Sequence, residues 1–157
     1  MMNKIKTREG ITKLAKELKL QGKKIVTING CFDLLHAGHV HMLEEAKQQG
    51  DILIVGLNSD KSVKSYKGLS RPIIPEQDRA KMLAALSCVD YVTLFDETDC
   101  LAFVDSVRPI VHVNGPEYGE NCIEAPLVKK HGGRIHIAKK VEGLSTSGII
   151  KKIKEMP

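Results

Sequence analysis

Residues 24–39 read KIVTINGCFDLLHAGH and carry the clearest structural pattern in the chain. The run from Lys24 to Asn29 is short and rich in β-branched residues, which predicts a buried strand that ends at Gly30. A helix is expected to begin near Gly38, so the segment predicts a strand, a tight turn and a helix. That order is typical of one βαβ unit in a parallel sheet.

The same alternation continues along the rest of the chain. Further strands are expected over 51–57, 91–94, 110–113 and 134–138, and helices over 8–21, 38–49, 75–86, 100–107, 125–130 and 146–154. The run 51–57, DILIVGL, is almost wholly apolar, as suits a parallel strand covered on both faces. We therefore predict an α/β, doubly wound fold with a mainly parallel five-stranded sheet and helices on both faces. The polar segment 58–74 is expected to be a long functional loop.

Length and composition favour one domain, residues 1–157. No apolar run approaches the roughly 18 residues of a membrane span, and residues 1–13 lack the apolar core of a secretory signal. We therefore expect a cytoplasmic protein that does not associate with membranes. The net charge of +5 fits nucleic acid or a small anionic substrate. The basic residues are dispersed without stacking aromatics between them, so we expect no nucleic-acid binding.

The cysteines at 31, 88, 100 and 122 form no CxxC pair and no Cys/His cluster with zinc-ligand spacing. Four reduced thiols are the expected state. His36 and His39 would be half of a zinc site, but no third ligand stands near them in sequence. The sequence therefore predicts no fixed protein metal site.

The turn after the first long strand has the features of a polyphosphate site. Gly30 allows the backbone to turn tightly and approach a ligand. Free amides and the dipole at the start of the next helix favour an anion. His36 and His39 lie three residues apart and should share a helix face, which Gly38 leaves open. Ordinary surface histidines are the alternative, but the whole string after a buried strand is far more specific than HxxH alone.

Two further segments add anion-binding groups. Asn58 and Asp60 follow the second long strand, and the cations Lys64, Lys67, Arg71 and Arg79 come after them. A solvated loop is the alternative, but the length and position of this segment favour a clamp for a reacting phosphate. Ser145, Thr146 and Ser147 precede the last helix, where hydroxyls either cap the helix or bind phosphate.

These motifs resemble those of the cytidylyltransferase-like nucleotidyltransferase superfamily, whose HxGH motif matches HAGH at 36–39. The resemblance covers about residues 8–154. Within the superfamily the chain is most similar to adenylyltransferases that make ADP-heptose from heptose 1-phosphate. The resemblance implies a Rossmann-like fold, ATP or CTP as the nucleotide donor, Mg²⁺ bound with the nucleotide, and often a homodimer.

The resemblance also assigns roles. His36, His39 and Lys67 would be catalytic, with Lys67 neutralising the leaving pyrophosphate, and Lys64 and Arg71 would bind the phosphorylated acceptor. Asp33 is in addition a candidate metal ligand or orienting group. The nucleotide-binding residues would be Asn29, Gly30, Cys31, Phe32, Asp33, Gly38, Asn58, Asp60, Arg79, Asn114, Gly115, Glu117, Tyr118, Ser145, Thr146 and Ser147.

Departures from the family pattern leave the substrates open. Heptose enzymes usually read Lys-Gly-Gly-Asp-Tyr where this chain has Asn114-Gly115-Pro116-Glu117-Tyr118, and glycerol 3-phosphate cytidylyltransferases read Gly-Asp-Asp-Trp. The glycerol enzymes also carry an arginine where this chain has Lys140. The favoured reaction is transfer of AMP from ATP to a sugar 1-phosphate with release of pyrophosphate. The alternatives are a CTP-dependent enzyme for a small phosphorylated alcohol and a non-catalytic nucleotide-binding module.

Overall fold

Six parallel strands form a single sheet in the computed structural model, which describes residues 2–157. The strand order is β1-β4-β3-β2-β5-β6, and every neighbouring pair is parallel. The strands are β1 (Ile5–Lys6), β2 (Ile25–Gly30), β3 (Ile52–Asn58), β4 (Tyr91–Phe95), β5 (Val111–Asn114) and β6 (Arg134–Ile137). The predicted Rossmann-like fold is confirmed.

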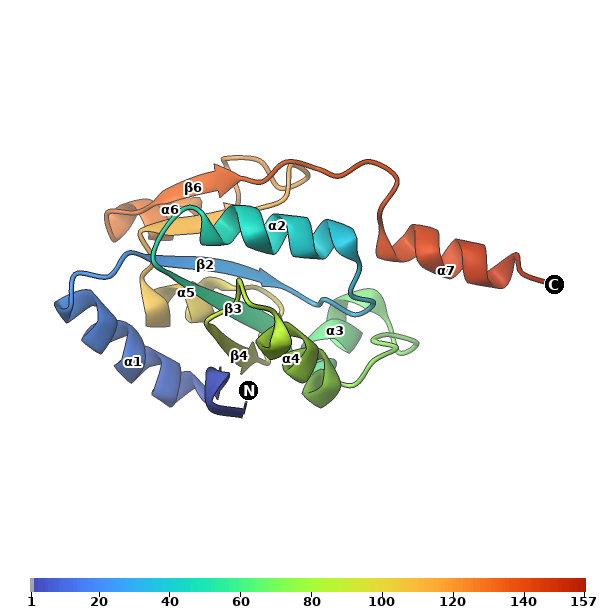
Figure 1. The fold of residues 1–157 in the computed structure, drawn as a ribbon, viewed down its shortest axis with the longest axis horizontal. Helices are drawn as coiled ribbons and strands as arrows, with labels where there is room; N and C mark the ends of the chain where they lie inside the picture. The colour runs from blue at the N-terminus through green and yellow to red at the C-terminus, as the bar shows by residue number, and fades with distance from the viewer. Residues whose placement is uncertain (1) are drawn as a thin grey trace.

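Helices connect the strands and cover both faces of the sheet (Figure 1). After a short 3₁₀ turn, η1 (Met2–Lys4), they are α1 (Arg8–Leu20), α2 (Ala37–Lys47), α3 (Asp60–Lys67), α4 (Glu76–Ala85), α5 (Leu101–Val107), α6 (Ala125–Lys130) and α7 (Thr146–Lys154). Ser145 caps α7 by accepting a hydrogen bond from the Gly148 amide, as the sequence predicts.

The sheet separates two hydrophobic cores. Leu53, Val55 and Leu57 of β3 point to the face that α2 and α4 cover, where Leu43 and Leu83 meet them. Alternate residues point to the opposite face, where α1, α5 and α6 supply the core around Ile54, Phe103 and Val128. The alternation follows from the two-residue period of a strand. Burial on both faces explains why β3 is apolar along nearly its whole length.

Two expectations were wrong. The sheet has six strands rather than five, because Ile5 and Lys6 pair with Val92 and Thr93 at its edge. Two residues are too few to produce a periodic pattern. The segment 58–74 is not wholly a loop, because it contains α3, which Ser59 caps at its N-terminus. Only Ser62 and Val63 of α3 are buried, so this polar helix lacks an apolar face that the sequence could reveal.

The chain reverses its direction across the sheet next to β2. The connection through α2 places β3 on one side of β2, whereas the connection from β4 through α5 returns to the other side, where β5 lies. Ligands of doubly wound sheets bind at this topological switch point, beyond the carboxyl ends of the strands. The ends of β2, β3 and β5 are therefore where a site is expected.

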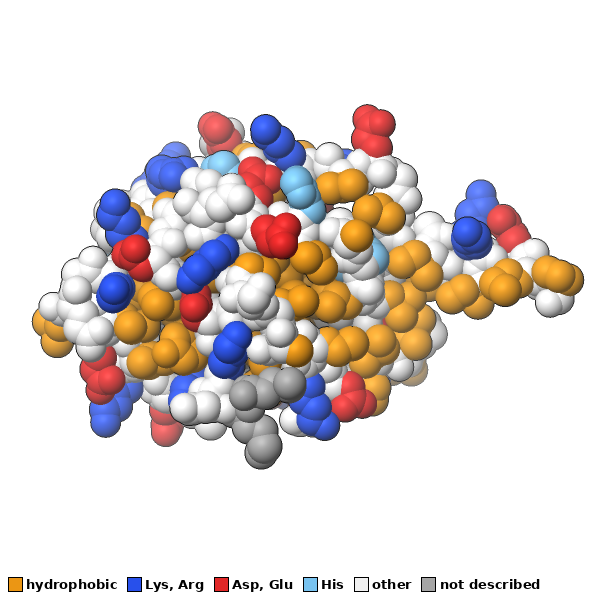
Figure 2. Space-filling model, in the orientation of Figure 1, with side chains coloured by type: hydrophobic (Ala, Val, Ile, Leu, Met, Phe, Trp, Pro, Cys, Tyr) orange, Lys and Arg blue, Asp and Glu red, His pale blue; other side chains and the backbone are white. Residues whose placement is uncertain are grey.

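The last helix, α7, projects from the body of the molecule (Figure 1), and none of its residues is buried. Its apolar side chains line one side and its charged side chains the other (Figure 2). No helix within residues 2–157 is both long enough and apolar enough to span a bilayer.

Candidate active site

A pocket of about 690 Å³ opens at the switch point. It has the size of a small-molecule site. The predicted residues in its wall are Asn29, Gly30, Cys31, Phe32, His39, Asn58, Lys67, Asn114, Gly115, Glu117 and Tyr118. These residues come from the ends of β2, β3 and β5 and from the segments that follow them, so the structure brings three distant parts of the sequence together.

The turn after β2 adopts its shape through Phe32 rather than Gly30. Phe32 has a φ of 44°, in the left-handed region that few residues other than glycine adopt. An added Cβ at Gly30 would lie 3.1 Å from the Phe32 ring, so a larger residue there would crowd that ring. The Phe32 ring in turn meets the edge of His39, with ring centroids 5.3 Å apart. Strained backbone of this kind is common at ligand sites.

His36 and His39 form the start of α2 and stack on one another, with ring centroids 3.8 Å apart. The Nδ1 atom of His36 accepts a hydrogen bond from the Gly38 amide, and Nδ1 of His39 accepts one from the His36 amide. A neutral imidazole that accepts at Nδ1 carries its proton on Nε2. Both rings are therefore set as Nε2 donors, which is the form that binds a phosphate oxygen without a proton transfer.

Burial keeps this pair uncharged near neutral pH. Burial, together with the neighbouring His36 and Lys67, lowers the pKa of His39 to about 4. Burial also lowers the pKa of His36. Gly38 makes room for the pair, since a Cβ there would lie 2.9 Å from the His36 ring. His39 lines the pocket, whereas His36 and Gly38 lie outside the pocket wall.

Lys67 supplies a positive charge in the pocket wall, close enough to His39 to lower the pKa of its ring. It is the last residue of α3, and its Nζ lies 3.1 Å from Cys31 Sγ. The end of α3 therefore reaches across to the turn after β2. Lys64, one turn earlier, is exposed and lies outside the pocket wall.

Arg79 lies beneath the site rather than in it, which corrects its expected role as a cation contacting phosphate. The side chain is fully buried, and its guanidinium donates to the carbonyl oxygens of Cys31, Asn58 and Ile74. It also donates to Asp60 Oδ1 at 2.7 Å. Arg79 thus fixes the ends of β2 and β3 relative to α4, and Asp60 is engaged in the same contact.

Asp33 is held by contacts within the protein, which match the orienting role among the two offered for it. Its buried carboxylate accepts hydrogen bonds from the amides of Ile73 and Ile74 and from Arg71 Nε. Burial alone would raise the pKa of Asp33, but these hydrogen bonds hold it below its usual value. Asp33 and Arg71 therefore join the turn after β2 to the segment before α4, and both lie outside the pocket wall.

At the far end of the pocket, the predicted residue Asn114 lies with Glu124 and Cys100, which were not predicted as site residues. Asn114 Nδ2 donates to Glu124 Oε1 at 2.5 Å. Although burial raises the pKa of Glu124, the neighbouring His112 side chain and the hydrogen bond from Asn114 lower it to about 2. Cys100 lies in the same wall, and burial raises the pKa of its thiol to about 12.

Part of this end of the pocket could have been predicted from the sequence. Thr98, Asp99 and Cys100 follow β4 just as the predicted site residues follow β2, β3 and β5. The rule that ligands bind beyond the carboxyl ends of strands applies to β4 equally. Glu124 and Cys122 lie beyond a loop, and no spacing in the sequence connects them to β4.

The hydroxyl patch before α7 lies outside the pocket wall. Ser145 acts as the helix cap, which was one of its two predicted roles. An added Cβ at Gly38 would lie 3.3 Å from the Leu144 side chain, so the residue before the patch reaches the start of α2. A phosphate-binding role for Ser145, Thr146 and Ser147 stays a prediction.

A doubly wound parallel sheet with paired histidines at the first helix beyond its switch point defines a class of nucleotide-handling domain. The chain belongs to the cytidylyltransferase-like family, whose model matches residues 27–152.

Three known proteins show how widely the likeness extends. The bifunctional protein HldE of Syntrophotalea carbinolica is 47% identical over 152 residues, which are 96% of this chain and 31% of that protein. The chain therefore spans about a third of the length of this relative. A lipopolysaccharide core biosynthesis protein from Thermoplasma volcanium is 33% identical with a TM-score of 0.64, covering 77% of this chain and 100% of that one. Pantoate-beta-alanine ligase from Francisella tularensis, at 14% identity and a TM-score of 0.61 over 98% of this chain and 79% of its own, shares the fold.

Proposed function

We propose that this protein transfers AMP from ATP to a sugar 1-phosphate, favouring heptose 1-phosphate, and so forms ADP-heptose and pyrophosphate. The observation that carries this proposal is the stacked pair His36 and His39, held as Nε2 donors at a pocket large enough for a nucleotide. The identity to HldE and the resemblance of the motifs to heptose 1-phosphate adenylyltransferases support the choice of substrates.

The proposed reaction is an in-line displacement at the α-phosphorus of ATP. A phosphate oxygen of the acceptor, already ionised, forms the new P–O bond as the bond to the departing pyrophosphate breaks, so no general base is required. His39, steadied by His36, donates a hydrogen bond to the phosphate oxygens on which charge develops, and Lys67 neutralises the pyrophosphate. Arg79 and Asp33 act as positioning residues, because they hold the backbone that surrounds these groups.

Mg²⁺ is expected to arrive with the triphosphate rather than to occupy a fixed carboxylate site beside the histidines. Both carboxylate oxygens of Asp33 accept protein hydrogen bonds, and Asp60 is held by Arg79 through Oδ1. When bound, the ion would neutralise charge on the phosphate oxygens. We also expect a homodimer, which sedimentation equilibrium of the purified chain would detect.

A CTP-dependent reaction is the second candidate, because one structural feature departs from the heptose pattern. Asn114 stands where those enzymes have lysine, and it is engaged by the buried Glu124. This pair lines the end of the pocket beyond the histidines. Asn114 in place of lysine gives the base and the acceptor a different surface to contact.

Pyrophosphate release tests both candidates. ATP and CTP are each combined with heptose 1-phosphate and with glycerol 3-phosphate in the presence of Mg²⁺, and the His39→Ala variant is the control for contaminating activity. Release with ATP and the heptose alone is the expected result. Release with CTP alone would replace the first candidate by the second. Equal rates in protein and variant, or no release in any combination, would contradict the proposed reaction.

A further inference from the structure

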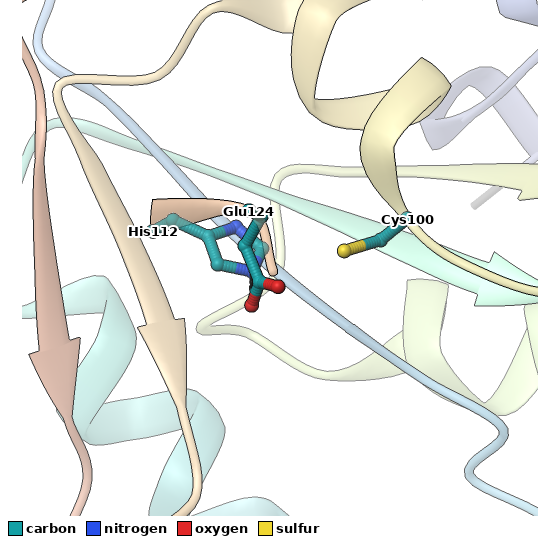
Figure 3. A group of neighbouring side chains, drawn as sticks. All are labelled: Cys100, His112 and Glu124. Atoms are coloured by element: carbon teal, nitrogen blue, oxygen red, sulfur yellow. Dashed lines mark ion pairs between the residues drawn. The ribbon is translucent and has the colours of Figure 1, made fainter. Parts of the chain in front are cut away.

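Three buried side chains with metal-binding atoms meet at the far end of the pocket. Cys100 is the N-cap of α5, His112 lies in β5, and Glu124 is the N-cap of α6. One ligand atom from each lies within 4.8 Å of the others. Figure 3 shows the Cys100 sulfur pointing toward the imidazole of His112 and the carboxylate of Glu124.

His112 has a ring nitrogen without a hydrogen bond. Its Nδ1 lies 2.7 Å from Thr27 Oγ1, whereas its Nε2 is buried and has no hydrogen-bond partner within the described chain. When Nδ1 carries the proton and donates it to Thr27, Nε2 presents a lone pair toward Glu124. A lone pair and a carboxylate oxygen repel one another, and a positive charge between them removes that conflict. Buried polar atoms without partners require such an explanation.

The spacing of these two groups fits a shared ion. Nε2 of His112 and Oε1 of Glu124 are 3.4 Å apart, and Nε2 is not counted as hydrogen bonded at that separation. Tetrahedral zinc, with bonds of about 2.0–2.3 Å, holds its ligand atoms roughly 3.3–3.8 Å apart. The pair is therefore already at the separation of two ligands, and Cys100 needs only a small approach.

Groups behind the cluster hold its members in place, as they do around zinc sites in general. Thr27 fixes the orientation of the His112 ring, and the hydrogen bond from Asn114 holds the Glu124 carboxylate in place. Cys100 and Glu124 also line the pocket, so a fourth position next to them faces the pocket. Three protein ligands with one open position are a common zinc arrangement.

We propose that Cys100, His112 and Glu124 bind one divalent transition-metal ion, with zinc as the best match to a sulfur, nitrogen and oxygen ligand set. On binding, the Cys100 thiol releases its proton to solvent, and the thiolate and carboxylate together neutralise the ion. The ion ties the segment after β4 to β5 and to the start of α6. It therefore fixes the end of the pocket opposite the histidines.

Cobalt provides the first test, because Co²⁺ occupies zinc sites and reports its ligands by absorption. The purified full-length chain is stripped with a chelator and titrated with Co²⁺ in the absence of nucleotide. We expect one ion per chain, intense visible bands from four-coordination, a thiolate-to-cobalt charge-transfer band, and loss of all of these when Zn²⁺ is added. A titration that gives no thiolate band overturns the proposal, and it does so whether or not the enzyme reaction exists.

Variants then identify the ligands. Cys100→Ser should lose the charge-transfer band, whereas Cys122→Ser, which changes a second cysteine of the same pocket wall, should keep it. Retention of the band in a folded Cys100→Ser protein, or its loss in a folded Cys122→Ser protein, contradicts the assignment. Thr27→Val keeps every ligand but removes the contact to His112, so Co²⁺ affinity should fall on the order of 10–100-fold. Unchanged affinity in Thr27→Val would mean that the bound ion does not use His112.

Discussion

The backbone amide of His36 donates to Nδ1 of His39 at 3.3 Å, so the main chain at the first histidine of the motif fixes the ring proton of the second on Nε2. His36 is itself fixed through the Gly38 amide. With two residues between the histidines, both Nδ1 atoms accept main-chain hydrogen bonds at the start of α2. Both Nε2 atoms are therefore left as donors. Because both donors are main-chain amides, replacing one histidine side chain leaves the hydrogen bond to the other ring in place.

His39→Ala should lower kcat on the order of 10²–10³-fold, since it removes one preorganised donor to the developing charge. Pyrophosphate release with saturating substrates measures the effect. The control is His41→Ala, which removes an exposed histidine from the same helix and should leave kcat within about twofold, as expected of a surface substitution. If the two variants lose activity equally, His39 has no special role.

The low pKa of His39 predicts how stability depends on pH. The unfolded chain binds a proton at His39 near its ordinary value of 6.5, whereas the folded protein does so only near 4. Between these values the unfolded state binds more protons, so the free energy of unfolding falls as the pH is lowered from about 6.5 toward 4. Urea unfolding at a series of pH values should show this slope, and His39→Gln should make it shallower. NMR titration of the His39 ring gives the pKa directly, and a value near 6.5 would contradict the prediction.

Arg79→Met should destabilise the protein by about 3 kcal/mol or more, because it leaves buried carbonyl oxygens and the Asp60 carboxylate without their partner. Denaturant unfolding measures the change. Lys81→Met, on the exposed side of the same helix, should change stability by no more than about 0.5 kcal/mol. A small effect at Arg79 would show that the ends of β2 and β3 hold their positions without it.

Removal of residues 142–157 should separate stability from activity. None of the residues in α7 is buried, so the free energy of unfolding should change by less than about 1 kcal/mol. If Ser145, Thr146 and Ser147 contribute hydroxyls to the phosphate, kcat/KM should fall steeply in the same protein. Full activity after truncation would leave these residues with the capping role alone.

The fold was predictable from the sequence wherever an element was long and apolar. The strand at 51–57 was predictable because burial on both faces makes it apolar along its length. The helix at 8–21 was predictable because burial on one face gives its apolar residues a helical spacing. β1 and α3 could not be found, because β1 contributes two residues to the sheet edge and α3 buries only Ser62 and Val63. Elements that contribute little to the core leave little periodicity in the sequence.

The site was predictable where chemistry and strand ends coincide. His39, Asn29, Lys67 and Glu117 were expected in the site, and they line the pocket. The role of Arg79 was misjudged, because a charged residue near a site looks the same in sequence whether it faces a ligand or supports the backbone. The cluster of Cys100, His112 and Glu124 was missed, since its members come from three separate elements and have no fixed spacing.

Arg79 contacts the turns after β2 and β3 through main-chain oxygen atoms, not through side chains. The Asn58 side chain is itself buried and donates to Ser62 Oγ, whereas Cys31 is only partly buried, and both residues line the pocket. A substitution at Cys31 can therefore alter what the pocket recognises while Arg79 still holds the main chain beneath it. Cys31 is thus a suitable starting point for redesigning the specificity of the pocket.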